Sequence, residues 1–198
     1  MKNNTILILC GILMSFFGYF QEDTTIEKIK KDFQNWDTFF NKSEELDYTI
    51  LHNYSWGKNY AHNAWYSEER EVDSLTRSKV VSIYENKELG YYIQLEKFSF
   101  SGDWFVISDH YFNPNGQLYF IYWRLSTFYA EVPATIERRL YFNEEGELIK
   151  NLESMYKMQT DEEINVSYME RKVEYKTNLK ELDFYNYWKE SSFPNDPK

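Results

Sequence analysis

Tyr111-Phe112-Asn113-Pro114-Asn115-Gly116-Gln117-Leu118 returns at positions 141–148 as Tyr141-Phe142-Asn143-Glu144-Glu145-Gly146-Glu147-Leu148. In each copy an aromatic pair runs into Asn-x-x-Gly, where Asn and Gly tolerate the left-handed backbone that a tight reversal needs. An apolar-rich segment then leaves the turn. Each copy therefore predicts a β-hairpin, and we expect antiparallel strands to organise the chain.

The segments on either side of the hairpins also alternate as strands do. We expect strands at 78–84, 91–99, 104–107, 119–123, 135–142 and 147–152, with turns at 85–90 and 100–103 and a longer connection over 126–134. Tyr119 to Trp123 is apolar on both faces, which predicts a strand covered from two sides. Residues 47–73 add a short strand or two. The predicted fold class is α+β, with an antiparallel meander of about five to seven strands.

Two helices are expected to flank this sheet. Thr24-Thr25-Ile26-Glu27 has the form of a capping box, and an apolar face follows at helical spacing, made by Ile26, Ile29, Phe33, Trp36 and Phe40. A membrane-surface or partner-binding helix is the alternative reading of this amphipathic pattern.

The C-terminal segment has two readings. Thr160-Asp161-Glu162-Glu163 is a second capping box, with acidic residues where a helix dipole favours them, and we predict a helix over 161–188. The competing strand reading rests on the clean alternation of Ile164-Asn165-Val166-Ser167-Tyr168. Beyond it, residues 191–198 are predicted to be a flexible tail.

The composition describes an aromatic-rich, acidic globular chain. Of 198 residues, 20% are aromatic, with 18 Tyr, 15 Phe and 6 Trp, which supplies ample material for a core. We expect a single domain over 21–190. The net charge of −10 opposes binding to nucleic acid and to anionic membranes. It suits a cationic partner or serves solubility alone.

The N-terminus indicates export. Lys2 precedes an uncharged, mostly apolar run from Ile6 to Phe20, which is short for a membrane span and suits a signal peptide over residues 1–20. Gly18-Tyr19-Phe20 is an unusual cleavage site, so retention as an anchor, the one membrane association expected here, stays open. Lipidation at Cys10 is a third reading. The expected location is periplasmic, cell-surface or secreted.

Motifs for chemistry are sparse. The histidines His52, His62 and His110 have no metal-ligand spacing and are expected at the surface or lightly buried. Asp109 and His110 are strand neighbours and should point to opposite faces, so they form no dyad. The glycine motifs of phosphate and dinucleotide sites and of serine hydrolases do not occur. We therefore predict no catalytic residue, no metal site and no cofactor.

A binding surface is the best candidate site. Five rings gather in the least regular part of the chain: Tyr54, Trp56, Tyr60, Trp65 and Tyr66. Exposed Trp and Tyr stack on sugars or peptide rings while their polar tips form hydrogen bonds, which suits recognition outside the cell. The competing interpretation places the same rings at one edge of the core.

Both hairpins carry Tyr-Phe-x-x-Gly-x-Leu, and in this the chain resembles small, uncharacterised exported proteins of Bacteroidetes type. The resemblance covers residues 74–152 and implies export, an N-terminal helix, a meander and a charged C-terminal helix, but no activity. A weaker likeness is to MORN-type hairpin repeats, which share the pattern. Two copies with unequal insertions do not make a repeat array.

Three functions are compatible with these features. The first is an exported, non-enzymatic interaction protein that binds a protein or glycan through its aromatic surface. The second is a small glycan-directed hydrolase with two convergent carboxyl groups, at least one with a raised pKa. The third is an acidic inhibitor or immunity-type protein that blocks a basic enzyme site. The sequence leans away from an enzyme and leaves the oligomeric state open.

Overall fold

The computed structural model describes residues 24–42, 48–56, 64–67 and 75–191. They fall into two parts, a helix over 24–42 and the residues from 48 onward, and each is described by itself. None of the described helices is long and apolar enough to cross a membrane. The predicted signal peptide, Tyr60 and the C-terminal tail lie outside the described residues.

Residues 24–42 are helical, as the apolar spacing predicts. The rings that recur along the helix pack on one another: the Trp36 indole lies with its centroid 5.6 Å from those of both Phe39 and Phe40. On the polar side, Lys30 pairs with Glu27 at 2.6 Å, one helical turn away.

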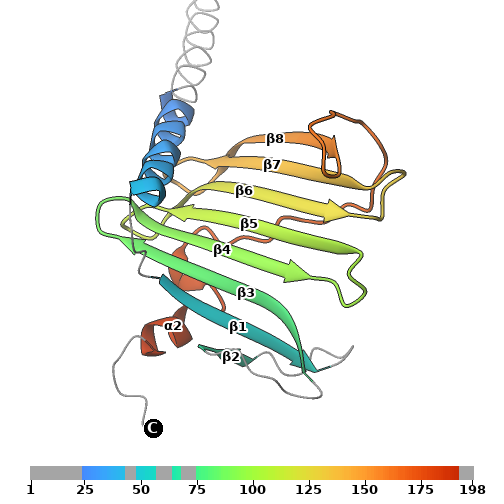
Figure 1. Ribbon diagram of the computed structural model, residues 1–198. Coiled ribbons are helices and arrows are strands. Elements are labelled where there is room, and N and C mark those ends of the chain that lie inside the picture. Colours follow the sequence, from blue (N-terminus) through green and yellow to red (C-terminus); the bar gives the residue numbers. More distant parts are fainter. Residues whose placement is uncertain (1–23, 43–47, 57–63, 68–74, 192–198) are drawn as a thin grey trace, which may run out of the picture. The chain divides into compact units, whose positions relative to one another are not determined.

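The second part is built on one antiparallel sheet (Figure 1). Its strands are β1 (Tyr48–Trp56), β2 (Ala64–Tyr66), β3 (Leu75–Asn86), β4 (Gly90–Phe98), β5 (Trp104–Phe112), β6 (Leu118–Thr127), β7 (Ala134–Phe142) and β8 (Leu148–Lys157). Their order across the sheet is β2-β1-β3-β4-β5-β6-β7-β8. The antiparallel meander is therefore confirmed.

The expected number of strands was too low, because the sheet has eight. Residues 47–73, expected to hold a short strand or two, contribute two strands, β2 of 3 residues and β1 of 9 residues, and β1 is therefore longer than expected. Its asparagine and its histidine, Asn53 and His52, weaken the strand pattern in the sequence. Pairing with β3 along the whole length of β1 supplies the backbone hydrogen bonds that local propensity does not indicate.

The repeated sequence forms two hairpins of the same geometry. The amide of Gly116 donates to the Asn113 carbonyl at 2.8 Å, and the amide of Gly146 donates to the Asn143 carbonyl at 3.0 Å. Both glycines have φ of +81°, a left-handed conformation that favours glycine. The strand register shifts after the tyrosine of each aromatic pair. The turn chemistry read from the sequence is thus confirmed.

The predicted helix over 161–188 is wrong. Residues 158–178, which we call the strap, begin with a turn at 158–160 and continue without a regular helix, and only short helical segments follow: η2 (Leu179–Glu181) and α2 (Tyr185–Ser191). The strap crosses one face of the sheet, behind it in Figure 1. Ile164, Val166 and Tyr168 alternate with exposed neighbours. This period of two lets the strap lie along a sheet with every second side chain inward.

The two faces of the sheet are named by what lies on them. The strap face carries the strap and α2, with core side chains that include Leu51, Ile93, Ile121, Leu125 and Ile136. The opposite face carries a row of six rings. One ring comes from β1 and one from each of β3 to β7, and neighbouring ring centroids are 5.0 to 5.6 Å apart: Tyr48, Tyr84, Tyr92, Tyr111, Phe120 and Tyr141. Each aromatic pair of the repeat supplies both faces, because Phe112 and Phe142 join the strap-face core.

Candidate functional site

A cavity of about 480 Å³ lies between the strap and the strap face. Its sheet wall comes mainly from β3 to β6, and its other walls come from the strap and from the segment that leads into α2. Three indoles, those of Trp65, Trp104 and Trp123, are among its lining groups. Pockets that hold small molecules typically measure about 300–1,000 Å³ and combine apolar walls with a few polar groups.

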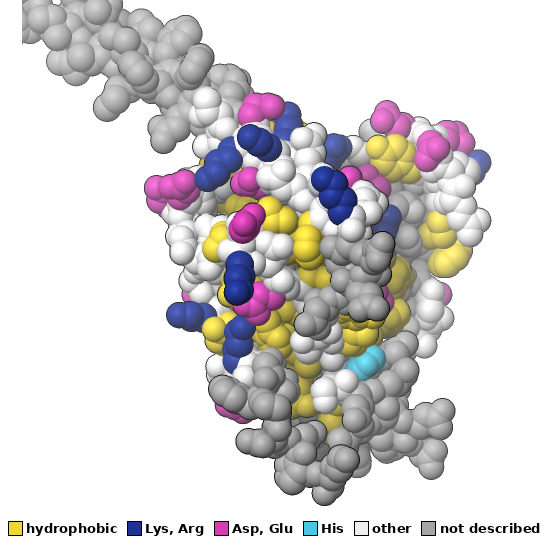
Figure 2. All heavy atoms as spheres, turned by 60° about the vertical axis from the view of Figure 1, so that its left-hand side comes forward, with side chains coloured by type: hydrophobic (Ala, Val, Ile, Leu, Met, Phe, Trp, Pro, Cys, Tyr) yellow, Lys and Arg dark blue, Asp and Glu magenta, His cyan; other side chains and the backbone are white. Residues whose placement is uncertain are grey.

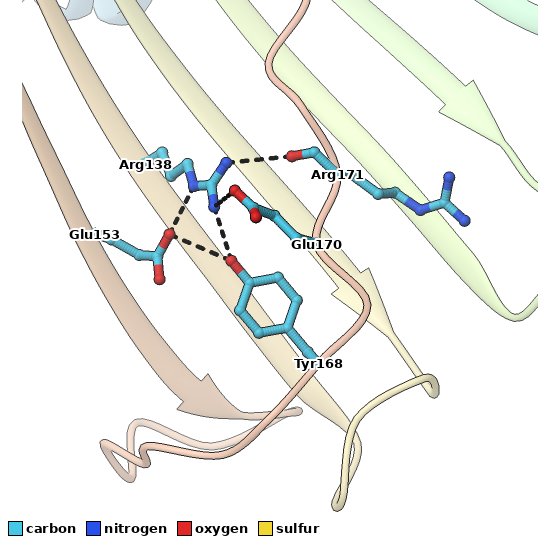
Figure 3. A network of polar contacts seen from close by, with 5 residues as sticks. All are labelled: Arg138, Glu153, Tyr168, Glu170 and Arg171. Carbon is cyan, nitrogen blue, oxygen red and sulfur yellow. Dashed lines mark hydrogen bonds and ion pairs between the residues drawn. The ribbon is translucent and has the colours of Figure 1, made fainter.

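The strap is anchored at one end of the cavity by Arg138 of β7 (Figure 3). Its Nε donates to Glu153 at 2.6 Å, and its Nη2 donates to the Tyr168 hydroxyl at 2.8 Å and to Glu170 at 3.3 Å. Nη1 donates to the backbone carbonyl of Arg171 at 3.2 Å. One buried guanidinium therefore ties two strands of the sheet to three residues of the strap.

The C-terminal end of the strap is bonded to the first hairpin and lies close to the second. The Leu118 amide donates to the Thr177 carbonyl at 2.9 Å, and the Leu179 amide donates to the Gly116 carbonyl at 2.8 Å. A β-carbon at Gly146 would lie 3.2 Å from the Thr177 side chain. The repeated turns thus have a second role, because they form the support on which the strap ends.

A buried polar pair lies at the sheet wall of the cavity. Ser108 and His110 are two residues apart on β5, so their side chains share the strap face, with Ser108 Oγ 2.7 Å from His110 Nε2. His110 is 1% exposed, and its Nδ1 has no hydrogen-bond partner among the described residues. Burial, and then the positive charge of Lys97, lower the pKa of His110 to about 3. The imidazole is therefore neutral at physiological pH.

The cavity is basic in an acidic protein. Five of its lining residues are cationic, namely Lys79, Lys97, Arg171, Lys172 and Lys176, and three are acidic, namely Glu170, Glu174 and Asp183. Two of the acids are already engaged, Glu174 by Lys97 at 2.5 Å and Glu170 by Arg138 at 3.3 Å. The hydrogen bond from Lys97, with the charges of Lys97 and Lys79, lowers the pKa of Glu174.

Arg171 has a distinct position among these cations. Its guanidinium carbon lies 3.8 Å from the centroid of the Trp104 ring, so the cation stacks on the indole. Within the described part of the chain, no carboxylate pairs with this guanidinium. A stacked guanidinium keeps its N–H groups in the plane parallel to the ring, where they can still donate to a further acceptor.

The described sequence-predicted residues do not form one surface. β2 pairs Trp65 with Asn53 and Tyr66 with His52, so these two neighbouring rings lie on opposite faces of the sheet. Trp65 lines the cavity and contacts Phe184, with ring centroids 5.4 Å apart. Tyr54 and Trp56 belong to β1, but their side chains, like all of Tyr60, lie outside the described residues. The predicted aromatic site is therefore represented in the cavity by Trp65.

Several residues of the cavity were missed by sequence reasoning. His110 was expected to be at the surface or lightly buried, yet it is 1% exposed, on the sheet face that the strap covers. A sequence signal did exist: Ser108 and His110 are separated by one residue in a strand, which places them on the same face. The expectation that Asp109 and His110 point to opposite faces is confirmed by the strand register.

The carboxyl group with a raised pKa lies away from the cavity. Asp109 faces the opposite side of the sheet, where Tyr92 and Gln94 donate to its Oδ1 at 2.9 and 3.0 Å. Burial raises the pKa of Asp109 despite these hydrogen bonds. Among the described residues, no group of three His, Cys, Asp or Glu side chains could hold a metal ion.

Charges of both signs are intermixed on the surface that Figure 2 draws, with hydrophobic side chains between them. An acidic inhibitor would need one broad acidic block, and the described residues on that face do not form one.

Comparison with known proteins adds no relative, since no family model, curated protein or solved structure matches the chain. The class that the fold and cavity define is an eight-stranded antiparallel sheet protein with a strapped cavity. The resemblance to exported Bacteroidetes-type proteins stays a prediction from the repeated hairpin sequence.

Proposed function

We propose that this protein is an exported, non-enzymatic binding protein that holds a small ring-bearing ligand, such as a sugar, between the strap and the sheet. The observation that carries the proposal is the cavity of about 480 Å³ with three indoles in its walls. Of the two partner types expected from the sequence, a glycan or a protein, a cavity of this size favours the smaller ligand.

The cavity lining offers a ligand two kinds of contact. Trp65, Trp104 and Trp123 contribute apolar surface to the cavity wall, against which a ring can pack, while charged side chains of the strap offer hydrogen bonds. Ser108 and His110 engage each other at 2.7 Å in the floor of the cavity. Because Arg138 holds the middle of the strap and the first hairpin holds its C-terminal end, the site is preformed, and a ligand loses less conformational entropy on binding.

Binding is favoured over hydrolysis by the placement of the carboxyl groups. A glycosidase needs two acids on either side of the substrate, one of them with a raised pKa. In the cavity, Glu174 has a lowered pKa and is bound to Lys97. Asp109, whose pKa is raised, belongs to the other face of the sheet.

The experiment is a titration of the purified chain with mono- and disaccharides and small aromatic compounds, followed by tryptophan fluorescence. A ligand in the cavity should change the emission because three indoles line it. The variant Leu95→Trp, which places a larger side chain in the cavity wall, should weaken binding at least tenfold by filling the site.

The matched control is Leu152→Trp, the same replacement on the edge strand β8, where the leucine is exposed and does not line the cavity. It should bind like the unmodified protein. The proposal is overturned if no compound of the panel binds, or if Leu95→Trp, shown to be folded by circular dichroism, binds as tightly as Leu152→Trp.

A further inference from the structure

The net charge of the cavity lining indicates which charge its ligand should have. The chain as a whole has a net charge of −10, yet the cavity lining has five cations against three acids. A random sample of this surface would be acidic, so the excess of positive charge is a local property of the site. Two of the three acids are compensated by Lys97 and Arg138, which leaves Asp183 as the third.

The cations come from separate elements and converge from two sides. Lys79 belongs to β3 and Lys97 to β4, and register pairs them directly across the two strands, so both side chains lie on the strap face. Arg171, Lys172 and Lys176 belong to the strap on the other side of the cavity. Like charges directly opposite each other on a sheet are destabilising, and Glu174 offsets this only in part.

Arg171 offers the best-defined anion contact. The contact with Trp104 holds its guanidinium against the cavity wall, and among the described residues no carboxylate occupies its donors. A planar guanidinium with free N–H groups matches a carboxylate or a sulfate in a two-point hydrogen bond. Lys97 is already paired with Glu174, so Lys79 is the second cation of the lining that the same anion can contact.

We infer that the ligand of this cavity is an anionic ring compound whose carboxylate or sulfate group binds Arg171 and Lys79 while its ring packs on the indole walls. This inference rests on the proposed function, because it names the chemical class of the ligand for the same cavity. Burial, and only then the charge of Lys97, lowers the pKa of His110, so the imidazole stays neutral at this wall of the cavity. The neutral imidazole places no further cation beside the ligand.

The test uses matched pairs of neutral and anionic rings: D-glucose with D-glucuronate, and benzamide with benzoate. Binding to the chain without the predicted signal peptide is measured by isothermal titration calorimetry at low salt. In at least one pair, the anionic member should bind about tenfold or more tightly than its neutral partner, as expected for a hydrogen-bonded charge. Added salt should reduce the preference.

Three variants locate the effect. Arg171→Gln should abolish most of the preference, and Lys79→Gln should reduce it by a smaller factor. Lys150→Gln is the control, because it removes one positive charge from β8, outside the cavity lining. It should leave the preference unchanged.

The outcomes separate the two proposals. If neutral and anionic members bind equally well, or if Arg171→Gln keeps the full preference, the inference about charge is overturned and the cavity remains a ring-binding site. If no member of either pair binds, and none of the wider panel does, the proposed function fails together with the inference. A folded Arg171→Gln variant that still binds the neutral ring confirms that only the anion contact was removed.

Discussion

Asp109 and His110 are neighbours on β5, and they face two different environments. His110 lies under the strap, shares a hydrogen bond with Ser108, and has its pKa lowered to about 3. Asp109 lies on the opposite face, accepts hydrogen bonds from Tyr92 and Gln94, and has its pKa raised. In both, burial is the largest cause, because loss of water disfavours the charged form of either group.

The comparison shows that each face suppresses a charge of a different sign. The strap face holds a base that stays neutral in a cavity lined by several cations, whereas the opposite face holds an acid that is hydrogen-bonded to Tyr92 of the ring row. A negative ligand is therefore compatible with the strap face and unfavourable on the other. The two faces should also respond to pH in opposite directions.

The largest effect is expected at the anchor of the strap. Arg138→Met removes hydrogen bonds to Glu153, Tyr168 and the Arg171 carbonyl, and it should lower the free energy of unfolding by about 3 kcal/mol. Urea unfolding measures this. Arg139→Met is the matched control on the opposite face, where the guanidinium donates to Ser154 at 3.3 Å, and it should cost less than about 1 kcal/mol. Equal losses would contradict the anchoring role.

His110 should make the protein less stable in acid. Its folded pKa of about 3 lies below the ordinary value of 6.5, so its contribution is complete above pH 6.5 and is lost as the pH falls toward 3. One proton gives a slope of about 1.4 kcal/mol per pH unit in this window. His110→Gln should flatten the fall in stability between pH 6 and 4, measured by urea unfolding. An unchanged slope would show that the imidazole is not held neutral.

Asp109 should have the smaller and opposite effect. Its raised pKa means that Asp109 holds a proton more tightly in the folded state than in the unfolded chain. The free energy of unfolding therefore decreases as the pH rises above the ordinary carboxyl pKa of 3.8. Asp109→Asn keeps an acceptor for Tyr92 and Gln94. It should raise stability at pH 7 by about 1 kcal/mol and give no gain at pH 3. A loss at pH 7 would mean that the charged hydrogen bonds outweigh burial.

Prediction from sequence succeeded where neighbours in the chain decide the structure. The two Asn-x-x-Gly turns, the helix over 24–42 and the opposite directions of Asp109 and His110 were all read correctly. Each depends on contacts within a few residues, or on the strict alternation of a strand. Of the aromatic residues that the sequence predicted as a binding site, only Trp65 is among the described residues that line the cavity.

The sequence by itself determined the hairpins, the antiparallel meander and the aromatic composition, because turn chemistry and alternation act locally. Only the tertiary structure decided that residues 158–178 form a strap rather than a helix, because their pairing with the sheet and the hairpins outweighs the local capping signal. The same long-range packing buried His110 and gathered five cations around one cavity. Those residues are distant in sequence, and only the folded chain brings them together.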